Sequence, residues 1–314
     1  MKNLWKYTQI DPAKVMVREV EFNTGKGGDP VVIIHMTDPH FNMFTERDLE
    51  NPALASTHEF RKWQANGQGV ANCEKCFEYA EAINADQVVI TGDVLDFLAE
   101  GTIGLMKEHI WDKHPKALVS LGNHEMSRKV QGKVEDDTTP ESRKQILKNA
   151  WAHDITYESR IIKDKVIAVV LDNSSESDFG HKGFFTEQIE PLKRDIELAR
   201  ENGMKLLLFF HDPLYTAKHD VGYTPVSFCG DKSLPFVNFA TQIKLWDNEG
   251  TLAVYDLITH NADVIAGCFC GHFHNDFYTE IRAWTPDGEE TLIPQYVLIG
   301  TPYNNGHVLK ITVK

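Results

Sequence analysis

The sequence predicts an α/β fold with a largely parallel sheet and a mixed or second sheet near the C-terminus. Short apolar runs alternate with amphipathic stretches over most of the 314 residues, which is the pattern of strand–helix–strand units. The last third instead holds strand-like runs separated by turns, one of them Thr285-Pro286-Asp287-Gly288. No internal repeat, low-complexity tract or Pro/Ser-rich linker divides the chain, so we expect residues 1–314 to form a single domain.

The strands are predicted from their apolar content and the helices from their amphipathic spacing. Six runs rich in Val, Ile, Leu and Phe are predicted as buried strands: 31–36, 87–91, 117–121, 166–171, 204–210 and 262–270. Four stretches are predicted as helices: about 70–84, 142–152, 186–202 (which Gly203 ends) and 248–260. Three further runs, 276–284, 291–299 and 306–313, are predicted as strands of the C-terminal sheet.

Three long segments fit neither pattern: 41–69, 125–140 and 212–236. Loops of this length in a compact domain are usually functional or disordered. Each one begins beside a polar residue that ends a predicted strand. We therefore expect these three loops to frame a site.

Composition and charge exclude several classes of protein. With 42% hydrophobic residues, the chain is not predominantly disordered. Its 32 Lys+Arg against 46 Asp+Glu give a net charge of −14, which argues against unspecific attraction to duplex nucleic acid or an anionic membrane. No apolar run is long enough to cross a bilayer, and no secretory signal follows Met1. Five cysteines, an odd number, favour free thiols in a reducing compartment, so we expect a cytoplasmic location.

Polar residues stand directly after five of the predicted strands. Because open α/β sheets bind ligands outside the carboxyl ends of their strands, we expect these five groups to converge. Each group brings Asp, His or Asn, whose oxygen and nitrogen atoms suit divalent transition metals. The groups are Thr37-Asp38-Pro39-His40, Gly92-Asp93-Val94-Leu95-Asp96, Gly122-Asn123-His124-Glu125, His211-Asp212 and Gly271-His272-Phe273-His274.

The order D-x-H, G-D-x-x-D, G-N-H-E, H and G-H-x-H resembles the calcineurin-like metallophosphoesterases, over residues 38–274 or about three quarters of the chain. The resemblance implies a four-layer α/β/β/α sandwich, in which two mixed central sheets are flanked by helices. It also implies a binuclear metal site. By motif position, the first metal would bind Asp38, His40, Asp93 and His274, and the second would bind Asp93, Asn123, His211 and His272.

The resemblance also assigns two residues that are not metal ligands. His124 corresponds to the family's histidine beside the phosphate, and Asp96 to the carboxylate that orients it. Two divalent cations can activate a bridging hydroxide for attack on phosphorus, while His124 assists the leaving oxygen. Manganese, iron and zinc all suit such a mixed nitrogen and oxygen site, and the ligand types do not choose among them.

We therefore expect a metal-dependent phosphoric ester hydrolase, with phosphodiesterase activity favoured. Residues 92–97 lack the Arg of the protein serine/threonine phosphatase branch, and Asp96 stands where purple acid phosphatases place a Tyr. The chain is thus more similar to the bacterial phosphodiesterases and phosphohydrolases of the family. The expected substrate is a small phosphate ester, with nucleotides among the candidates, and the sequence indicates no particular protein partner.

Two alternatives stay open. A phosphomonoesterase would act on a small phosphorylated metabolite, and basic residues of the long loops would clamp its phosphate: Arg47, Arg61, Lys62, Lys218 or Lys232. A binding or scaffold protein would keep the fold without turnover. Such a protein would be expected to lose the acid histidine or a bridging ligand, whereas this chain retains all of these positions.

Overall fold

The structure is a computed structural model that describes residues 6–8, 15–61, 67–126, 139–174, 183–214, 218–219, 249–302 and 305–314. The strands are β1 (Lys6–Thr8), β2 (Met16–Phe22), β3 (Val31–Met36), β4 (Gln87–Thr91), β5 (Leu118–Ser120), β6 (Tyr157–Ile162), β7 (Val166–Leu171), β8 (Lys205–Phe209), β9 (Lys218–His219), β10 (Ile265–Cys270), β11 (Phe277–Trp284), β12 (Glu290–Val297) and β13 (His307–Val313).

The α-helices are α1 (Glu46–Glu50), α2 (Pro52–Arg61), α3 (Gly69–Ala82), α4 (Glu100–Met106), α5 (Asn123–Met126), α6 (Pro140–Ala150), α7 (Ile189–Asn202) and α9 (Glu249–Thr259). A π-helical turn, η2 (Lys107–Trp111), continues α4, and a 3₁₀ turn, η3 (Thr186–Gln188), leads into α7.

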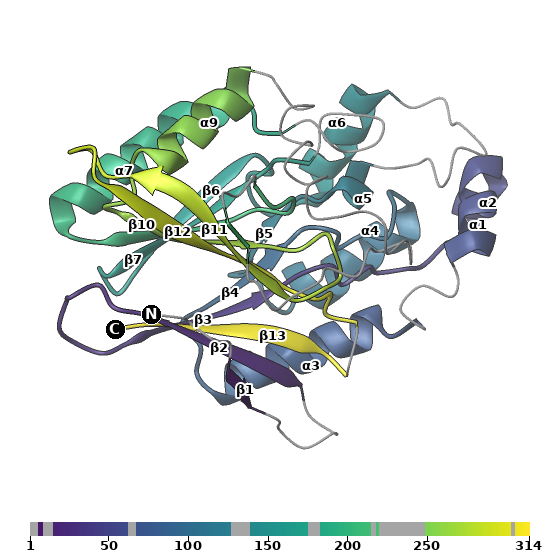
Figure 1. Cartoon of the computed structure of the whole chain (residues 1–314). Coiled ribbons are helices and arrows are strands. Elements are labelled where there is room, and N and C mark those ends of the chain that lie inside the picture. The colour runs from purple at the N-terminus through teal and green to yellow at the C-terminus, as the bar shows by residue number, and fades with distance from the viewer. Residues whose placement is uncertain are drawn as a thin grey trace.

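The strands form two mixed sheets that lie face to face (Figure 1). The first sheet has the order β1-β2-β13-β3-β4-β5, in which β3, β4 and β5 run parallel. The second has the order β6-β7-β8-β10-β12-β11-β9, in which β7, β8, β10 and β12 run parallel. The carboxyl ends of these parallel strands provide the edge on which a ligand site is expected.

Alternation along each strand builds the layers. In β3, Ile33 joins the cluster between the two sheets, whereas Ile34 joins the cluster on the outer face. In β8, Phe209 likewise faces the other sheet and Leu208 faces outward. Strands that are buried on both faces need continuous apolar runs, which is the pattern that predicted them.

Helices cover both outer faces. Residues of α3, η2 and α6 pack on the first sheet, and residues of α7 and α9 pack on the second. Figure 1 shows α3 on one side of the paired sheets and α7 and α9 on the other. The predicted four-layer α/β/β/α sandwich is confirmed.

The structure contains every predicted strand and helix, together with elements that the sequence did not predict, among them α4 and η2. The predicted loop 41–69 is wrong in part, because it contains α1 and α2. Strand β2 and the edge strand β6, which contain charged residues within short runs, also lie outside the predicted strands. The predicted loops 125–140 and 212–236 lie mostly outside the described residues.

Candidate metal centre

All nine residues that the sequence singled out come together at the carboxyl ends of the strands. Asp38 and His40 follow β3, Asp93 and Asp96 follow β4, and Asn123 and His124 open α5 directly after β5. From the second sheet, His211 follows β8, and His272 and His274 follow β10. The site therefore lies between the two sheets, with contributions from both.

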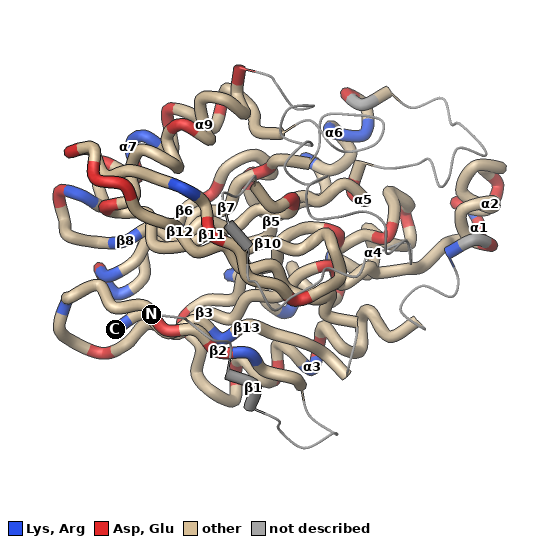
Figure 2. Tube along the Cα trace, viewed as in Figure 1, with Lys and Arg blue, Asp and Glu red and all other residues tan. Residues whose placement is uncertain are grey.

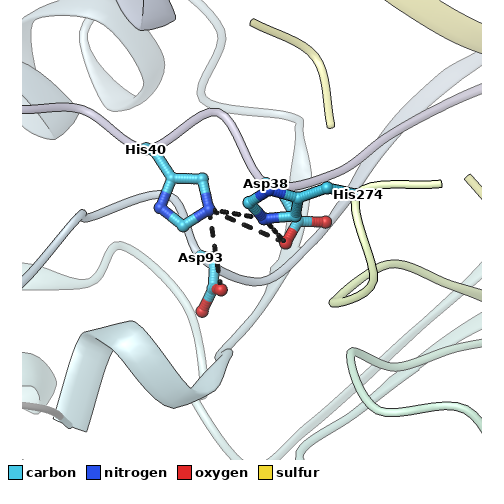
Figure 3. A group of neighbouring side chains, drawn as sticks. All are labelled: Asp38, His40, Asp93 and His274. Atoms are coloured by element: carbon cyan, nitrogen blue, oxygen red, sulfur yellow. Dashed lines mark hydrogen bonds and ion pairs between the residues drawn. The ribbon is translucent and has the colours of Figure 1, made fainter. Parts of the chain in front are cut away.

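The first group contains Asp38, His40, Asp93 and His274, whose ligand atoms lie within 4.8 Å of one another (Figure 3). Nε2 of His274 is 3.0 Å from Oδ1 of Asp38 and 2.8 Å from Nε2 of His40. Nε2 of His40 is 3.8 Å from the nearer oxygen of both Asp38 and Asp93. These four residues are the predicted first ligand set.

The second group contains Asp93, His211 and His272. Nε2 of His211 is 3.2 Å from Oδ2 of Asp93 and 3.2 Å from Oδ1 of Asn123. The same Asn123 oxygen is 3.0 Å from Nδ1 of His272. Oδ2 of Asp93 thus faces both groups, which is the position that a bridging carboxylate requires.

Five of these residues have a left-handed backbone conformation. Non-glycine residues rarely adopt φ near +50°, and each such residue costs about 1–3 kcal/mol that the surrounding structure must offset. Backbone hydrogen bonds enforce this conformation in part, because His40 donates its N–H to the Asp93 carbonyl at 2.9 Å. Such strain clusters at functional sites. The five residues are Asp38 (φ 50°), His40 (48°), Asp93 (50°), His272 (71°) and His274 (49°), among nine described non-glycine residues with positive φ.

The glycine of each G-D or G-N pair allows the loops to approach closely. A Cβ at Gly122 would collide with Oδ1 and the backbone nitrogen of Asp93. Gly92 has φ +72°, and a Cβ there would lie 2.5 Å from Nδ1 of His211. These two positions require glycine because the loops after β4, β5 and β8 meet there.

Electrostatics favour a cation in the cluster. Burial lowers the pKa of His40 to about 4, so its ring is the neutral imidazole that metals bind. At His211, burial would lower the pKa, but the carboxylates of Asp93 and Asp38 outweigh burial and raise it well above its ordinary value. The negative charge of the cluster therefore attracts positive charge, which a metal would supply.

His124 borders the metal groups and is 21% exposed, with Nε2 4.0 Å from Oδ2 of Asp93. Its Nδ1–H donates to the backbone carbonyl of Asp96 at 2.6 Å, whereas the Asp96 carboxylate is 3.6 Å away. That carboxylate accepts the Nδ1–H of His40 at 3.0 Å instead. Asp96 thus contacts both histidines, His40 through its carboxylate and His124 through its backbone carbonyl, and the role of its carboxylate in orienting His124 stays a prediction.

Arg61, a candidate phosphate clamp, also pairs with Asp96. Its guanidinium donates to both carboxylate oxygens, with Nε at 3.1 and 3.0 Å. Burial alone would raise the pKa of the Asp96 carboxyl, but hydrogen bonds from His40 and Arg61 hold it well below its ordinary value. Of the other candidate clamps, Arg47 is an exposed residue of α1, Lys218 lies in β9, and Lys62 and Lys232 lie outside the described residues.

Sequence reasoning assigned no role to Glu125, although it is part of G-N-H-E. Its buried carboxylate accepts backbone N–H groups from Asp93 at 3.0 Å, Leu95 at 2.9 Å and Gly122 at 2.6 Å. It therefore joins the loop after β4 to the loop after β5. The position of Glu125 in the G-N-H-E motif was the sequence signal that pointed to this residue.

Asp212 was also given no role. Its carboxylate lies 3.3 Å from Nδ1 of His272 and accepts the hydroxyl of Ser174 at 2.7 Å. Ser174 and Asn173 follow β7, so the fourth parallel strand also ends in polar residues that serve the site. A carboxylate beside a metal-binding histidine fixes the orientation of its ring.

The donor set fits two divalent cations. Each group combines imidazole nitrogens with carboxylate oxygens, the set typical of zinc, iron and manganese. Oδ1 of Asp38 is buried and faces Nε2 of His274 at 3.0 Å, so an oxygen and a nitrogen suited to metal binding point at the same position. The Nε2 atoms of His40 and His274 lie 2.8 Å apart, so both rings present a nitrogen to the same position.

The fold and this Asp/His centre define a metal-binding α/β/β/α protein. The model of the family described as calcineurin-like phosphoesterase matches residues 31–276, so the chain belongs to that family. Family and site together support metal-dependent hydrolysis of phosphate esters. A search of curated proteins finds no match.

Solved structures with a similar fold include a dimetal phosphatase from Danio rerio and a purple acid phosphatase from seeds of yellow lupin (Lupinus luteus). The first is 12% identical with a TM-score of 0.45, and the match covers 87% of this chain and 88% of that one. The second is 12% identical with a TM-score of 0.47, and the match covers 95% of this chain and 46% of that one.

Proposed function

We propose that the protein is a binuclear metal-dependent phosphoesterase that prefers diesters. The observation that carries this proposal is the shared carboxylate of Asp93, which faces two groups of ligands from two sheets. Two divalent cations held there would supply Lewis acidity and an activated water. Asp38, His40 and His274 would hold the first cation with Asp93, and Asn123, His211 and His272 the second.

His124 is proposed as the group that assists the leaving oxygen. Its Nδ1 is fixed by the Asp96 carbonyl, so Nε2 is the atom that can carry a proton toward substrate. Its ring packs edge-to-face against His40, with centroids 4.7 Å apart, which holds it beside the metal positions. A proton at Nε2 would stabilise an alkoxide as it leaves phosphorus.

The preference for diesters rests on charge. A phosphodiester carries one negative charge, whereas a phosphomonoester near neutral pH carries up to two and benefits from an additional cationic clamp. Arg61, which could have served as that clamp, donates to Asp96 instead. The described part of the site therefore suits the less charged ester.

The experiment compares hydrolysis of bis(p-nitrophenyl) phosphate and p-nitrophenyl phosphate by metal-stripped protein with Mn²⁺ added back. We expect no activity without metal and faster cleavage of the diester with it. Faster cleavage of the monoester would overturn the diester preference and favour the phosphomonoesterase. Two bound metals with no cleavage of either ester would favour the non-catalytic scaffold. Parallel additions of Fe²⁺ and Zn²⁺ identify the metal that supports the highest rate.

We further propose a small substrate and a cytoplasmic location. Lys and Arg are interspersed with Asp and Glu along the described chain, so no element there presents the continuous basic stripe that duplex nucleic acid requires (Figure 2). Among the described residues, no helix has both the length and the apolar composition to span a membrane. The four described cysteines are free and buried. For a protein in a reducing compartment, thiol titration of the unfolded protein without reductant should find all five cysteines as free thiols.

A further inference from the structure

The carboxylate of Asp96 is buried and surrounded by donors. Arg61 donates to both of its oxygens, Asn42 Nδ2 donates to Oδ2 at 2.7 Å, and His40 Nδ1 donates to Oδ1 at 3.0 Å. A guanidinium that spans both oxygens of a carboxylate fixes its plane as well as its charge. Asp96 is thus held by a rigid cation on one side and a metal-binding histidine on the other.

Arg61 reaches this position from outside the sheets. It is the last residue of α2, yet its side chain is only 8% exposed. Asn42 also donates to the backbone carbonyl of Arg61 at 3.1 Å, which ties the end of α2 to the same carboxylate. A buried ion pair of this kind contributes little to stability on its own, so its placement suggests a role in the site.

His40 connects Arg61 to the first metal position. Figure 3 shows that the Nε2 edge of the His40 ring points toward Asp38 and His274. The opposite nitrogen, Nδ1, donates to Asp96, so Nε2 is left with the lone pair that a metal binds. The backbone of the same Asp96 holds His124 at 2.6 Å.

We propose that Arg61 is a positioning residue for the first metal position, because it fixes Asp96, which in turn fixes the tautomer and orientation of His40. This inference rests on the proposed binuclear centre and concerns metal binding before any substrate is present. Without the guanidinium, the Asp96 carboxylate would lose the donors that fix its plane. The Nδ1–H of His40 would then lose a fixed acceptor, and the first position would bind metal more weakly than the second.

The test measures Mn²⁺ binding to metal-stripped protein by calorimetry, without substrate. We expect two sites in the wild type, and about 10–100-fold weaker binding at one of them in Arg61→Met, with the other unchanged. Arg61→Lys keeps the charge but not the two-pronged contact, so it should recover part of the affinity. The ¹⁵N shifts of the His40 ring should report Nδ1–H in the wild type and a mixture of tautomers in Arg61→Met.

Leu54→Ala is the matched control, because Leu54 lies on the same helix, is buried, and packs in an apolar cluster with Phe97 and Ala99. It should loosen α2 and leave both Mn²⁺ affinities unchanged. Wild-type affinities in Arg61→Met, or an equal loss in Leu54→Ala, would overturn the proposal. If Arg61→Met does not fold, the affinities of Arg61→Lys provide the test. Wild-type Mn²⁺ affinity at both positions in Arg61→Lys would then overturn the proposal. If Arg61→Met loses affinity for one Mn²⁺ ion and the wild type cleaves neither ester, this inference is supported and only the proposed hydrolysis is overturned.

Discussion

At the scale of the residue, Asp93 makes the contacts that join the two halves of the centre. Its Oδ2 faces His40 and His211, and its Oδ1 accepts the N–H of His124 at 2.9 Å. Its backbone N–H is bound by Glu125. The pKa of its carboxyl would be raised by burial, but the nearby histidines outweigh burial and lower it well below its ordinary value. Hydrogen bonds to its Oδ1 and from its backbone N–H therefore fix Asp93 in place.

Asp93→Asn should remove bound metal and activity together. The amide has the shape of the carboxylate but no charge and only one acceptor oxygen, so it cannot bridge two cations. We expect metal content to fall from two ions per chain to less than one, as measured by elemental analysis. Asp195→Asn is the control, since Asp195 is also a buried aspartate but accepts the hydroxyl of Tyr157 at 2.7 Å. Full metal content in Asp93→Asn would show that the bridging assignment is wrong.

His124→Ala should keep the metals and lose rate. Proton donation contributes about 10²–10⁴-fold where the leaving group is a poor one, so the loss should be largest for an alkyl ester and smallest for nitrophenolate. His153→Ala is a suitable control, because His153 is 22% exposed, close to the 21% of His124, and its ring pairs with Glu158. An equal loss for both leaving groups would rule out proton donation by His124.

Residue-level inference from the sequence succeeded where the chemistry was local. The seven predicted metal ligands follow apolar strands in short motifs, so their convergence could be predicted from the strand ends. The pairing of Arg61 with Asp96 spans 35 residues and depends on α2, which no apolar periodicity marks. The hydrogen bond from His124 to the Asp96 carbonyl was not predicted for a similar reason, because it depends on the backbone conformation of the loop after β4.

At the scale of the element, close approach of loops determines which residues the strand ends tolerate. Gly122→Ala would place a methyl group against Asp93, and overpacking of this kind costs about 1–3 kcal/mol. We expect weaker Mn²⁺ binding and a lower free energy of unfolding in urea. Gly104→Ala is the matched control, because Gly104 is exposed in α4 with open space around it, and alanine should stabilise that helix by roughly 0.5–1 kcal/mol. Wild-type metal binding in Gly122→Ala would contradict the role assigned to this contact.

Asp48 attaches the helices of segment 41–69 to the rest of the fold. Its carboxylate accepts backbone N–H groups from Thr45 at 2.8 Å, Glu100 at 2.8 Å and Gly101 at 2.9 Å. Burial raises the pKa of this carboxyl, but these hydrogen bonds outweigh burial and bring the pKa below its ordinary value of 3.8. The stabilisation is therefore present above pH 3.8 and is lost as the pH falls through the lowered pKa of the folded state.

Asp48→Asn should lower the free energy of unfolding by about 1–3 kcal/mol at pH 7, because charged acceptors form stronger hydrogen bonds than amides. It should also reduce the loss of stability between neutral and acid pH, as measured by urea unfolding at several pH values. Glu46→Gln, an exposed acid on the same helix, should leave both quantities unchanged. A pH profile of Asp48→Asn that parallels the wild type would show that the depressed pKa of Asp48 does not contribute.

Strand prediction was accurate where burial is complete on both faces. Strands β3, β4 and β7 begin and end at the predicted residues because they are rich in buried Val, Ile and Leu. Strand β6 exposes Ile161 and contains Glu158 and Arg160, so it carries no apolar run. Its place is fixed by antiparallel pairing with β7, which is a tertiary contact that no local pattern records.

At the scale of the whole molecule, the metal centre is a junction between the two sheets. Asp38, Asp93 and Asn123 follow strands of the first sheet, whereas His211 and His274 follow strands of the second. Below the centre the sheets are joined by the apolar cluster around Ile33 and Phe209. At the centre itself they meet through charged and polar groups, whose mutual attraction depends on what neutralises the carboxylates.

Metal binding should therefore raise the stability of the entire fold. A ligand at 100 times its dissociation constant stabilises the native state by about 2.7 kcal/mol, which for a chain of this size corresponds to a rise in Tm of roughly 4 °C. We expect calorimetric scans of metal-stripped protein to shift upward with Mn²⁺ and to return with a chelator. Asp93→Asn should show no shift, because neither position can then hold its ion. An unchanged Tm in wild-type protein that binds two Mn²⁺ ions would mean that the unfolded chain binds them equally well, and that the centre does not join the sheets.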